Sequence, residues 1–396
     1  MIMISRRLTS TLYSRARDYP VVTIIGPRQS GKTTLCRNAF PEKPYSNLER
    51  PDIRDFAIHD PSGYLAQFPD GAILDEIQRV PDLLSWIQAR VDDNRRTGEF
   101  ILTGSHHFDI RQRISQSLAG RTALLNLLPL SVSELKEVGM SIDVDRLLHA
   151  GGYPRIHADN LDPSVMLSDY FATYVERDLR ELVQLRHVRE FERFVRLAAG
   201  RVGQLLNLHS LASDVGVSSH TAKAWLALLE ASFVVFVLPP WFANIGKRLT
   251  KSPKLYFYDV GLAAWLIGIT RESHLASHPL RGLLFENLVI LELLKARINS
   301  GLGANLHFYR DSSGLEVDLL LESGNDIVLA EIKSTQTINA ELFRPLKKTA
   351  AILGNRVTEK YLVYGGKEKQ ERSESHVVSY VDAGEVGLLE GDRRPG

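Results

Sequence analysis

The sequence is poor in cysteine: its 396 residues contain a single one, Cys36. One thiol cannot form an intramolecular disulfide, and it cannot build a zinc site from cysteine ligands. Chains without disulfides are typical of reducing compartments, so a cytoplasmic location is expected. Cys36 is interpreted as a small core residue of a helix rather than as a redox group.

Long hydrophobic runs and net charge are also scarce. The longest strongly apolar run, residues 233–238, is too short to span a bilayer, and residues 1–10 lack the apolar stretch of a signal peptide. No membrane partner is therefore expected. The 48 basic and 47 acidic side chains leave a formal net charge of +1, so any attraction to nucleic acid must come from a local patch.

The chain is long enough for two or three domains, and one motif dominates its first part. Residues 21–25, VVTII, predict a short buried strand, and a helix is predicted from Thr34 onward. Between them stands the pattern G-x-x-x-x-G-K-[ST], which is the P-loop. Its members are Gly26, Pro27, Arg28, Gln29, Ser30, Gly31, Lys32 and Thr33, with Thr34 directly after them.

The chemistry of this pattern favours a nucleotide site. Gly26 and Gly31 let the backbone turn tightly so that N–H groups face one phosphate chain, and the helix that follows adds its positive end. Lys32 can neutralise phosphate oxygens, and the Thr33 hydroxyl can hold Mg²⁺. The alternative, a glycine-rich turn with a surface lysine, is disfavoured by the flanking strand and helix. ATP and Mg²⁺ are the predicted cofactors.

A second predicted strand ends in two acids, Asp75 and Glu76, within the run GAILDEIQ of residues 71–78. Because the carboxyl ends of parallel strands share one edge, Asp75 is expected beside Thr33, where both would hold Mg²⁺. Glu76 is then available to orient or deprotonate the attacking water. Many strands end in an acid, so the signal gains its weight from its distance after the P-loop.

Ser105 follows the next predicted strand, residues 99–103. At the end of the strand beside the two acids, its hydroxyl would sense the terminal phosphate or hold the water; the alternative is a helix-capping serine. The adjacent His106 and His107 would diverge on a strand or helix, and no third ligand is visible nearby, so a metal site is not favoured there.

Arg121 stands just before the predicted strand at residues 122–128. It is the candidate arginine finger that would reach the nucleotide of a neighbouring copy, so a homo-oligomer is a candidate assembly. Arg111 and Arg113 compete for that role, and a plain surface arginine is the alternative reading. Together, these motifs predict an α/β P-loop domain with a largely parallel sheet.

The middle of the chain predicts helices. A helix–turn–helix is expected around Gly216, followed by a wing strand at residues 233–238. Between residues 205 and 240 the only lysine or arginine is Lys223, which is few cations for a DNA-reading surface. A packing or lid role is therefore favoured, and residues 241–254 form the better basic patch. Arg155 is a candidate second phosphate sensor.

The last third carries its own constellation of charged residues. Asp318 on one predicted strand, followed by Glu331 and Lys333 on the next, matches the PD-(D/E)xK nuclease pattern. Strand alternation places Glu331 and Lys333 on one face. Asp318 and Glu331 would hold Mg²⁺, Lys333 would position water, and Glu286 from a preceding apolar helix would be a further ligand. The alternative is the same fold without cleavage.

From about residue 1 to about 385, the chain resembles a broad family of bacterial and archaeal P-loop ATPases that join an AAA-type domain to a C-terminal domain of unknown function with a restriction-endonuclease-like core. The resemblance implies ATP binding and hydrolysis and says little about biological role. It rests on GPRQSGKTT (26–34), ILDEIQ (73–78), ILTGS (101–105), LAGR (118–121), PLSVSEL (129–135), GGYPR (151–155), KLYFYDVGLAAWL (254–266), GLLFEN (282–287) and EVDLLL with EIK (316–333).

The predicted fold is α/β in three parts. They are an AAA-type P-loop domain (1–155), a helical and winged-helix connector (156–250) and a restriction-endonuclease-like α/β domain (251–396). The leading hypothesis is ATP hydrolysis that drives a conformational switch in the attached modules. One alternative is an ATP-gated, Mg²⁺-dependent DNA endonuclease. Another is a non-catalytic, ATP-dependent regulator that binds DNA or a protein partner.

Overall fold

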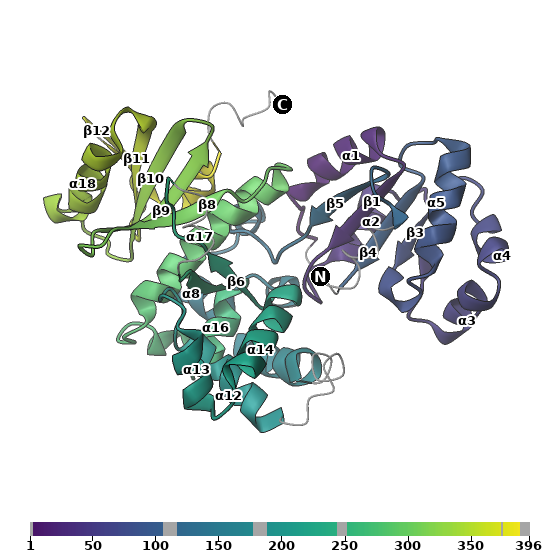
Figure 1. Cartoon of the computed structure of the whole chain (residues 1–396), viewed down its shortest axis with the longest axis horizontal. Coiled ribbons are helices and arrows are strands. Elements are labelled where there is room, and N and C mark those ends of the chain that lie inside the picture. The colour runs from purple at the N-terminus through teal and green to yellow at the C-terminus, as the bar shows by residue number, and fades with distance from the viewer. Residues whose placement is uncertain (1–2, 106–116, 177–187, 244–251, 374, 389–396) are drawn as a thin grey trace.

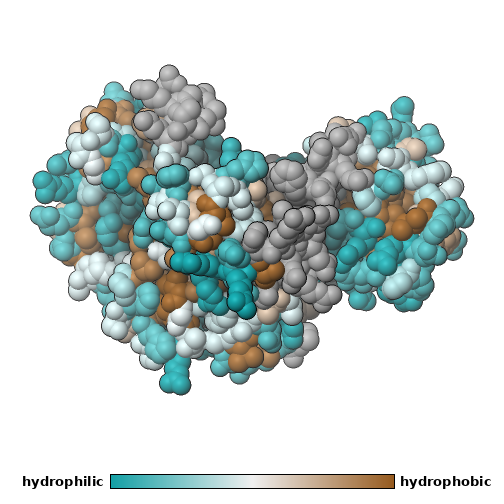
Figure 2. Space-filling model, turned by 60° about the horizontal axis from the view of Figure 1, so that its bottom comes forward, coloured by the Kyte–Doolittle hydropathy of each residue, from teal (hydrophilic) through white to brown (hydrophobic). Residues whose placement is uncertain are grey.

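The computed structural model describes residues 3–105, 117–176, 188–243, 252–373 and 375–388 of the chain. Two α/β lobes lie at opposite sides of the molecule, and a helical part sits below the C-terminal lobe (Figure 1). In the space-filling view of Figure 2, hydrophilic residues cover much of the visible surface of the N-terminal lobe, at the right. Within the described ranges, no helix combines the length and apolar character needed to cross a membrane.

The N-terminal lobe is a parallel sheet in the order β2-β3-β4-β1-β5. Its strands are β1 (Val21–Ile25), β2 (Tyr45–Asn47), β3 (Ala72–Asp75), β4 (Phe100–Gly104) and β5 (Thr122–Asn126). Its helices are α1 (Leu8–Asp18), α2 (Lys32–Ala39), α3 (Pro51–His59), α4 (Pro61–Ala66) and α5 (Leu83–Asn94), with a 3₁₀ turn at Ile77–Arg79.

Alternating side chains of the central strands pack on the two faces of this sheet. Val22 and Ile24 face a core shared with α1 and α2, whereas Val21 and Ile25 face a second core that includes α5. Strands buried on both faces read as continuous apolar runs, as VVTII does. The largely parallel sheet expected from the sequence is confirmed.

The middle of the chain is mostly helical. Its helices are α7 (Val132–Glu137), α8 (Val144–Ala150), α9 (Pro154–Ala158), α10 (Pro163–Tyr170), a π-helix (Phe171–Glu176), α12 (Val188–Ala199), α13 (Leu208–Val215), α14 (Ser219–Ala231) and α16 (Val260–Leu266). Gly216, at φ 86°, ends α13 in the left-handed conformation that glycine adopts at least cost, so the expected turn is confirmed. An antiparallel hairpin of β6 (Val235–Leu238) and β7 (Lys254–Phe257) follows.

The C-terminal lobe is a mixed sheet in the order β12-β13-β11-β10-β9-β8. Its elements are α17 (Arg281–Asn299), β8 (Leu306–Arg310), β9 (Glu316–Ser323), β10 (Asp326–Lys333), α18 (Arg344–Leu353), β11 (Val357–Tyr364), β12 (Gln370–Arg372), β13 (Ser375–Ser379) and α19 (Ala383–Val386). Leu319 and Val328 belong to the core that includes α17, whereas Leu320 and Leu329 belong to the core that includes α18.

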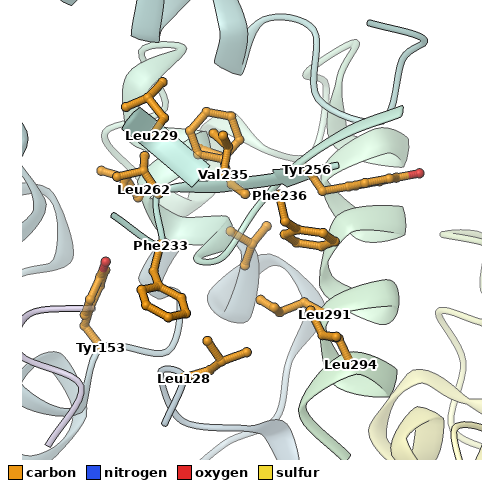
Figure 3. Close-up of a cluster of buried hydrophobic side chains, with 14 of the residues drawn as sticks. Leu128, Tyr153, Leu229, Phe233, Val235, Phe236, Tyr256, Leu262, Leu291 and Leu294 are labelled. Carbon is orange, nitrogen blue, oxygen red and sulfur yellow. The ribbon is translucent and has the colours of Figure 1, made fainter. Parts of the chain in front are cut away.

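A single hydrophobic core joins the middle of the chain to both lobes. Figure 3 shows Leu128, which follows β5, near Phe233 beside the hairpin and Leu291 of α17. All three are buried, and they belong to one contiguous cluster of apolar side chains. Because α17 also contacts α1, the long helix links the C-terminal sheet to the N-terminal lobe.

Candidate functional site

The P-loop lies between the end of β1 and the start of α2, as the sequence predicts. Gly31 caps α2 with φ 91°, a left-handed conformation that residues with a Cβ rarely adopt. Gln29 also has a positive φ of 61°. This turn presents the first backbone N–H groups of α2 toward the loop, where an anion can accept their hydrogen bonds.

The Lys32 side chain is folded back into the loop. Its Nζ donates to the carbonyl oxygens of Gly26 at 3.0 Å and Pro27 at 2.8 Å, and the residue is only 6% exposed. Burial lowers the pKa of Lys32 to about 8, although the charges of Glu76 and Asp75 oppose that shift. A bound anion could therefore take the place of these two carbonyl oxygens as hydrogen-bond acceptors of the Lys32 ammonium.

Asp75 at the end of β3 is surrounded by hydroxyl groups. Its Oδ2 accepts hydrogen bonds from Thr33 Oγ1 at 2.9 Å and Tyr45 OH at 2.7 Å, and its Oδ1 accepts from Thr103 Oγ1. Burial and the bond to Asp75 raise the pKa of Tyr45. The structure thus brings together Thr33 and Asp75, and it adds Tyr45 and Thr103, which the sequence analysis did not single out.

Glu76 is fixed by two polar neighbours. Its backbone is left-handed, with φ 59°, and its Oε2 accepts from Ser105 Oγ at 3.0 Å and from Gln78 Nε2. Gln78 Nε2 also donates to Ser105 Oγ at 3.0 Å. Ser105 is fully buried at the end of β4. Glu76 and Ser105, which the sequence singled out separately, are therefore in contact, and Gln78 is a neighbour that sequence reasoning missed.

Arg121 lies at the amino ends of the strands, whereas the P-loop lies at their carboxyl ends. The strand register pairs Val21 with Thr122 and Ile25 with Asn126, so Arg121 stands at the end of the strands away from the P-loop. Its Nη2 is 2.8 Å from Asp92 Oδ2, and its side chain is 33% exposed. The geometry excludes contact with the nucleotide of its own chain, which leaves the arginine-finger role as a prediction about a neighbouring copy.

Of the other residues considered in the sequence analysis, the structure describes only some. Arg155, in α9, is 59% exposed and faces Asp159, and its sensor role stays a prediction. Pro154, at the start of α9, lies near Gly31, so this short helix is beside the P-loop. Four further candidates lie outside the described residues, namely His106, His107, Arg111 and Arg113.

The C-terminal sheet brings Asp318, Glu331 and Lys333 together. Lys333 Nζ lies 3.1 Å from Asp318 Oδ2 and 2.6 Å from Glu331 Oε1. The backbone N–H of Ile332 donates to Asp318 Oδ2 at 2.8 Å. Asp318 and Glu331 are buried, whereas Lys333 is partly exposed. The expected convergence of these three side chains on neighbouring strands is therefore present.

Glu286 on α17 joins the same cluster. Its Oε1 lies 3.0 Å from Lys254 Nζ and 2.5 Å from Tyr256 OH. Burial, together with the negative charge of Asp318, raises the pKa of Glu286 to about 7 and that of Glu331 to about 8. Raised pKa values are expected where carboxylates lie close together out of water, because their negative charges repel one another.

This C-terminal acidic cluster, made of Glu286, Glu316, Asp318 and Glu331, differs from the expected set of three ligands around one ion. Among the described residues, no group of three acidic, histidine or cysteine side chains is arranged to hold a metal. Ammonium groups stand among the carboxylates instead: Lys254 beside Glu286 and Glu316, and Lys333 beside Asp318 and Glu331. The metal-binding roles of Glu286, Asp318 and Glu331 stay predictions.

The parallel sheet and its loop define an AAA-type P-loop domain, and residues 18–136 match the family described as AAA domain. Residues 141–273 and 281–383 match two families described as domains of unknown function, DUF8612 and DUF4143. The chain is 33% identical over 385 residues to the uncharacterized proteins Rv2008c of Mycobacterium tuberculosis and Mb2031c of Mycobacterium bovis. The alignment covers 96% of this chain and 85% of theirs, and the chain belongs to the same family as these two proteins.

Solved structures with some likeness include the Walker-type ATPase Paby2304 of Pyrococcus abyssi. That match has a TM-score of 0.41 and 15% identity, and it covers 67% of this chain and 96% of the other. AMPPCP-bound DnaA from Aquifex aeolicus matches with a TM-score of 0.29 and 14% identity, over 56% of this chain and 85% of that one.

Proposed function

We propose that the protein binds and hydrolyses ATP at the edge formed by β1, β3 and β4. The observation that carries the proposal is the meeting of Thr33, Asp75 and Glu76 at this edge, with Lys32 in the loop beside them. Two oxygen donors 2.9 Å apart, Thr33 Oγ1 and Asp75 Oδ2, fit a hard cation such as Mg²⁺. Bound with the nucleotide, Mg²⁺ would neutralise charge on the phosphate oxygens.

The side chains of this site then have separate tasks. Lys32 exchanges the carbonyl oxygens of the loop for phosphate oxygens. Glu76 accepts a proton from the attacking water. Since Ser105 and Gln78 both reach Oε2 of Glu76, Oε1 is the oxygen that we assign to the water. Tyr45 fixes the orientation of Asp75 from the neighbouring strand.

We also propose that hydrolysis drives a conformational switch in the attached modules. Arg6, whose side chain is 8% exposed, donates to Ser30 O of the P-loop at 2.6 Å and lies 3.1 Å from Glu134. The backbone N–H of Val132, in the same first turn of α7, donates to Glu292 of α17 at 2.7 Å. These contacts support the proposal because they connect the nucleotide loop to the helix that carries Glu286.

The test of the proposed activity is steady-state ATP turnover by the purified full-length chain in the presence of Mg²⁺. Turnover should be lost in Asp75→Asn, which keeps the size of the side chain and removes its charge. If the wild-type protein binds ATP without hydrolysing it, the proposed ATPase activity is wrong. The result would then favour the other alternative, a non-catalytic regulator that uses ATP only to set its shape.

A second candidate function is Mg²⁺-dependent DNA cleavage gated by nucleotide. The juxtaposition of Asp318, Glu331 and Lys333 favours it. With Mg²⁺ and ATP, plasmid should then be nicked, and Asp318→Asn should reduce the rate roughly a hundredfold or more, as loss of a metal ligand or catalytic carboxylate does. The matched control is Glu322→Gln, on the same strand but paired with Arg356 at 2.9 Å, which should cut normally. Intact plasmid with every cofactor combination would remove this candidate and leave the ATPase untouched.

Assembly is tested through Arg121. If it acts on the nucleotide of a neighbour, ATP turnover per chain should rise with protein concentration. Mixing inactive Lys32→Ala and Arg121→Ala proteins should restore part of the turnover, because one shared interface then holds an intact loop and an intact arginine. Arg96→Ala is the control, since Arg96 is exposed and pairs with Asp70 at 3.0 Å. Full turnover by a protein that stays monomeric would contradict the role.

A further inference from the structure

A buried lysine from the middle of the chain enters the C-terminal acidic cluster. Lys254 is the first residue of β7, yet its Nζ lies 3.0 Å from Glu286 Oε1 and 2.6 Å from Glu316 Oε1. The residue is 3% exposed, and its ammonium also sits 5.5 Å above the ring of Phe308. Lysine is almost never fully buried unless it is paired. The two carboxylates therefore account for the burial of Lys254.

The β6–β7 hairpin brings Lys254 to this place. After β6, the main chain runs along the edge strand β8: Phe308 N donates to Pro239 O at 3.1 Å, and Trp241 N donates to Phe308 O at 2.6 Å. The hairpin is thereby joined to the edge of the C-terminal sheet. Lys254 thus belongs to a separate element that docks on the sheet, whereas Lys333 belongs to the sheet itself.

The charges of the cluster show what Lys254 contributes. Arg310 and Lys333 stand at the rim, with side chains 45% and 37% exposed, whereas the Lys254 side chain is only 4% exposed. The Lys254 ammonium is therefore the most deeply buried of these three cations, and it lies within ion-pair distance of two carboxylates.

One carboxylate oxygen in the cluster remains unsatisfied. Glu331 is 3% exposed, and its Oε2 has no hydrogen-bond partner among the residues that the structure describes. A buried oxygen without a partner carries a desolvation cost that a bound cation or proton removes. The cluster thus gathers the oxygen donors that a hard divalent cation prefers, with an ammonium already present among them.

We propose that Lys254 is the resident counter-ion of the C-terminal acidic cluster, and that its ammonium keeps a divalent cation from binding there. The ammonium satisfies Glu286 and Glu316 with a single positive charge. Without this ammonium, the buried Glu286 and the partly exposed Glu316 lose their shared counter-ion, and the repulsion among the clustered carboxylates favours uptake of a divalent ion. The inference concerns the site of the second candidate function, but metal uptake does not depend on whether cleavage follows.

The experiment titrates Mn²⁺ into full-length protein without nucleotide and measures free ion by electron paramagnetic resonance. An Asp75→Asn background removes the Mg²⁺ site proposed at the P-loop. Adding Lys254→Met, which keeps an unbranched side chain one atom shorter and removes its charge, should produce one Mn²⁺ site per chain with affinity roughly tenfold or more above that of the background. Adding Asp318→Asn to that variant should remove the site.

The matched control is Lys295→Met. Lys295 is equally buried and pairs with Glu292 at 3.0 Å, but it lies outside the acidic cluster, so its loss should create no Mn²⁺ site. Lys254→Arg retains the charge and should bind no better than the background. Should Lys254→Met unfold, as judged by circular dichroism and thermal melting, Lys254→Gln replaces it.

Two results would overturn the proposal. One is a tight Mn²⁺ site in the background protein that Asp318→Asn removes, because the cluster would then take metal with Lys254 in place. The other is equal Mn²⁺ binding by folded Lys254→Met or Lys254→Gln and by Lys295→Met. Plasmid cleavage is measured separately, so a metal site without cleavage counts against the second candidate function and leaves this inference standing.

Discussion

Replacing Glu76 with glutamine is expected to slow ATP turnover roughly a hundredfold or more while nucleotide binding remains. The amide keeps the shape of the side chain but cannot accept the proton of the attacking water. Ser105 Oγ, 3.0 Å from Glu76 Oε2, can still bond to the amide oxygen, so the local structure should survive. The slower turnover should therefore arise in the hydrolysis step and not in nucleotide binding or folding.

Single-turnover hydrolysis with excess enzyme, beside equilibrium binding of a fluorescent ATP analogue, separates these two quantities. Glu49→Gln serves as the matched control, because Glu49 is exposed and faces Arg79 at 3.4 Å. The control should hydrolyse ATP at the wild-type rate. Wild-type turnover by Glu76→Gln would show that another group activates the water.

The elements that position the nucleotide site could be predicted because their signals are local. VVTII is apolar throughout and gives β1, and the glycine at position 31 predicts the left-handed turn that precedes α2. The acids of ILDE gave the edge at which Asp75 meets Thr33, since parallel strands share their carboxyl ends. Each of these inferences needs only a short window of sequence.

The rest of the site depends on which strands become neighbours. Tyr45 and Thr103 reach Asp75 from β2 and β4, and no periodicity in the sequence states that these strands flank β3. Gln78 was missed for a different reason: it lies in the quoted run ILDEIQ, but only the turn at Ile77–Arg79 directs its amide back to Glu76.

In the C-terminal acidic cluster, too, some contacts follow from local sequence and others only from the fold. Alternation along β10 was enough to place Glu331 and Lys333 together. Lys254 is 32 residues from Glu286 and 62 from Glu316 in the sequence, and its arrival depends on the docking of the hairpin against β8. The motif therefore predicted Glu286, Asp318 and Glu331 as metal ligands, whereas the fold adds Glu316 and places Lys254 beside Glu286 and Glu316.

Replacing Lys32 with alanine is expected to abolish detectable ATP binding while the fold remains. The lysine is the cation of the loop, and phosphate oxygens that lose it have no equivalent partner at that position. The substitution removes two hydrogen bonds to Gly26 and Pro27 carbonyls, which water can replace once the side chain is gone. Equilibrium ATP binding by calorimetry, with thermal melting as the fold check, measures both outcomes, and unimpaired binding would contradict the role.

The wild-type protein should also show a pH dependence that originates in Lys32. Its pKa is lowered to about 8 by burial, so the ammonium is mostly protonated at pH 7 and mostly neutral at pH 9. ATP binds the protonated form, and the affinity should therefore fall as pH rises, by about tenfold between pH 7 and pH 9. Lys32→Arg keeps its charge across that range, so its affinity, whatever its value, should not change with this profile. An identical pH profile in both proteins would assign the dependence to a group other than Lys32.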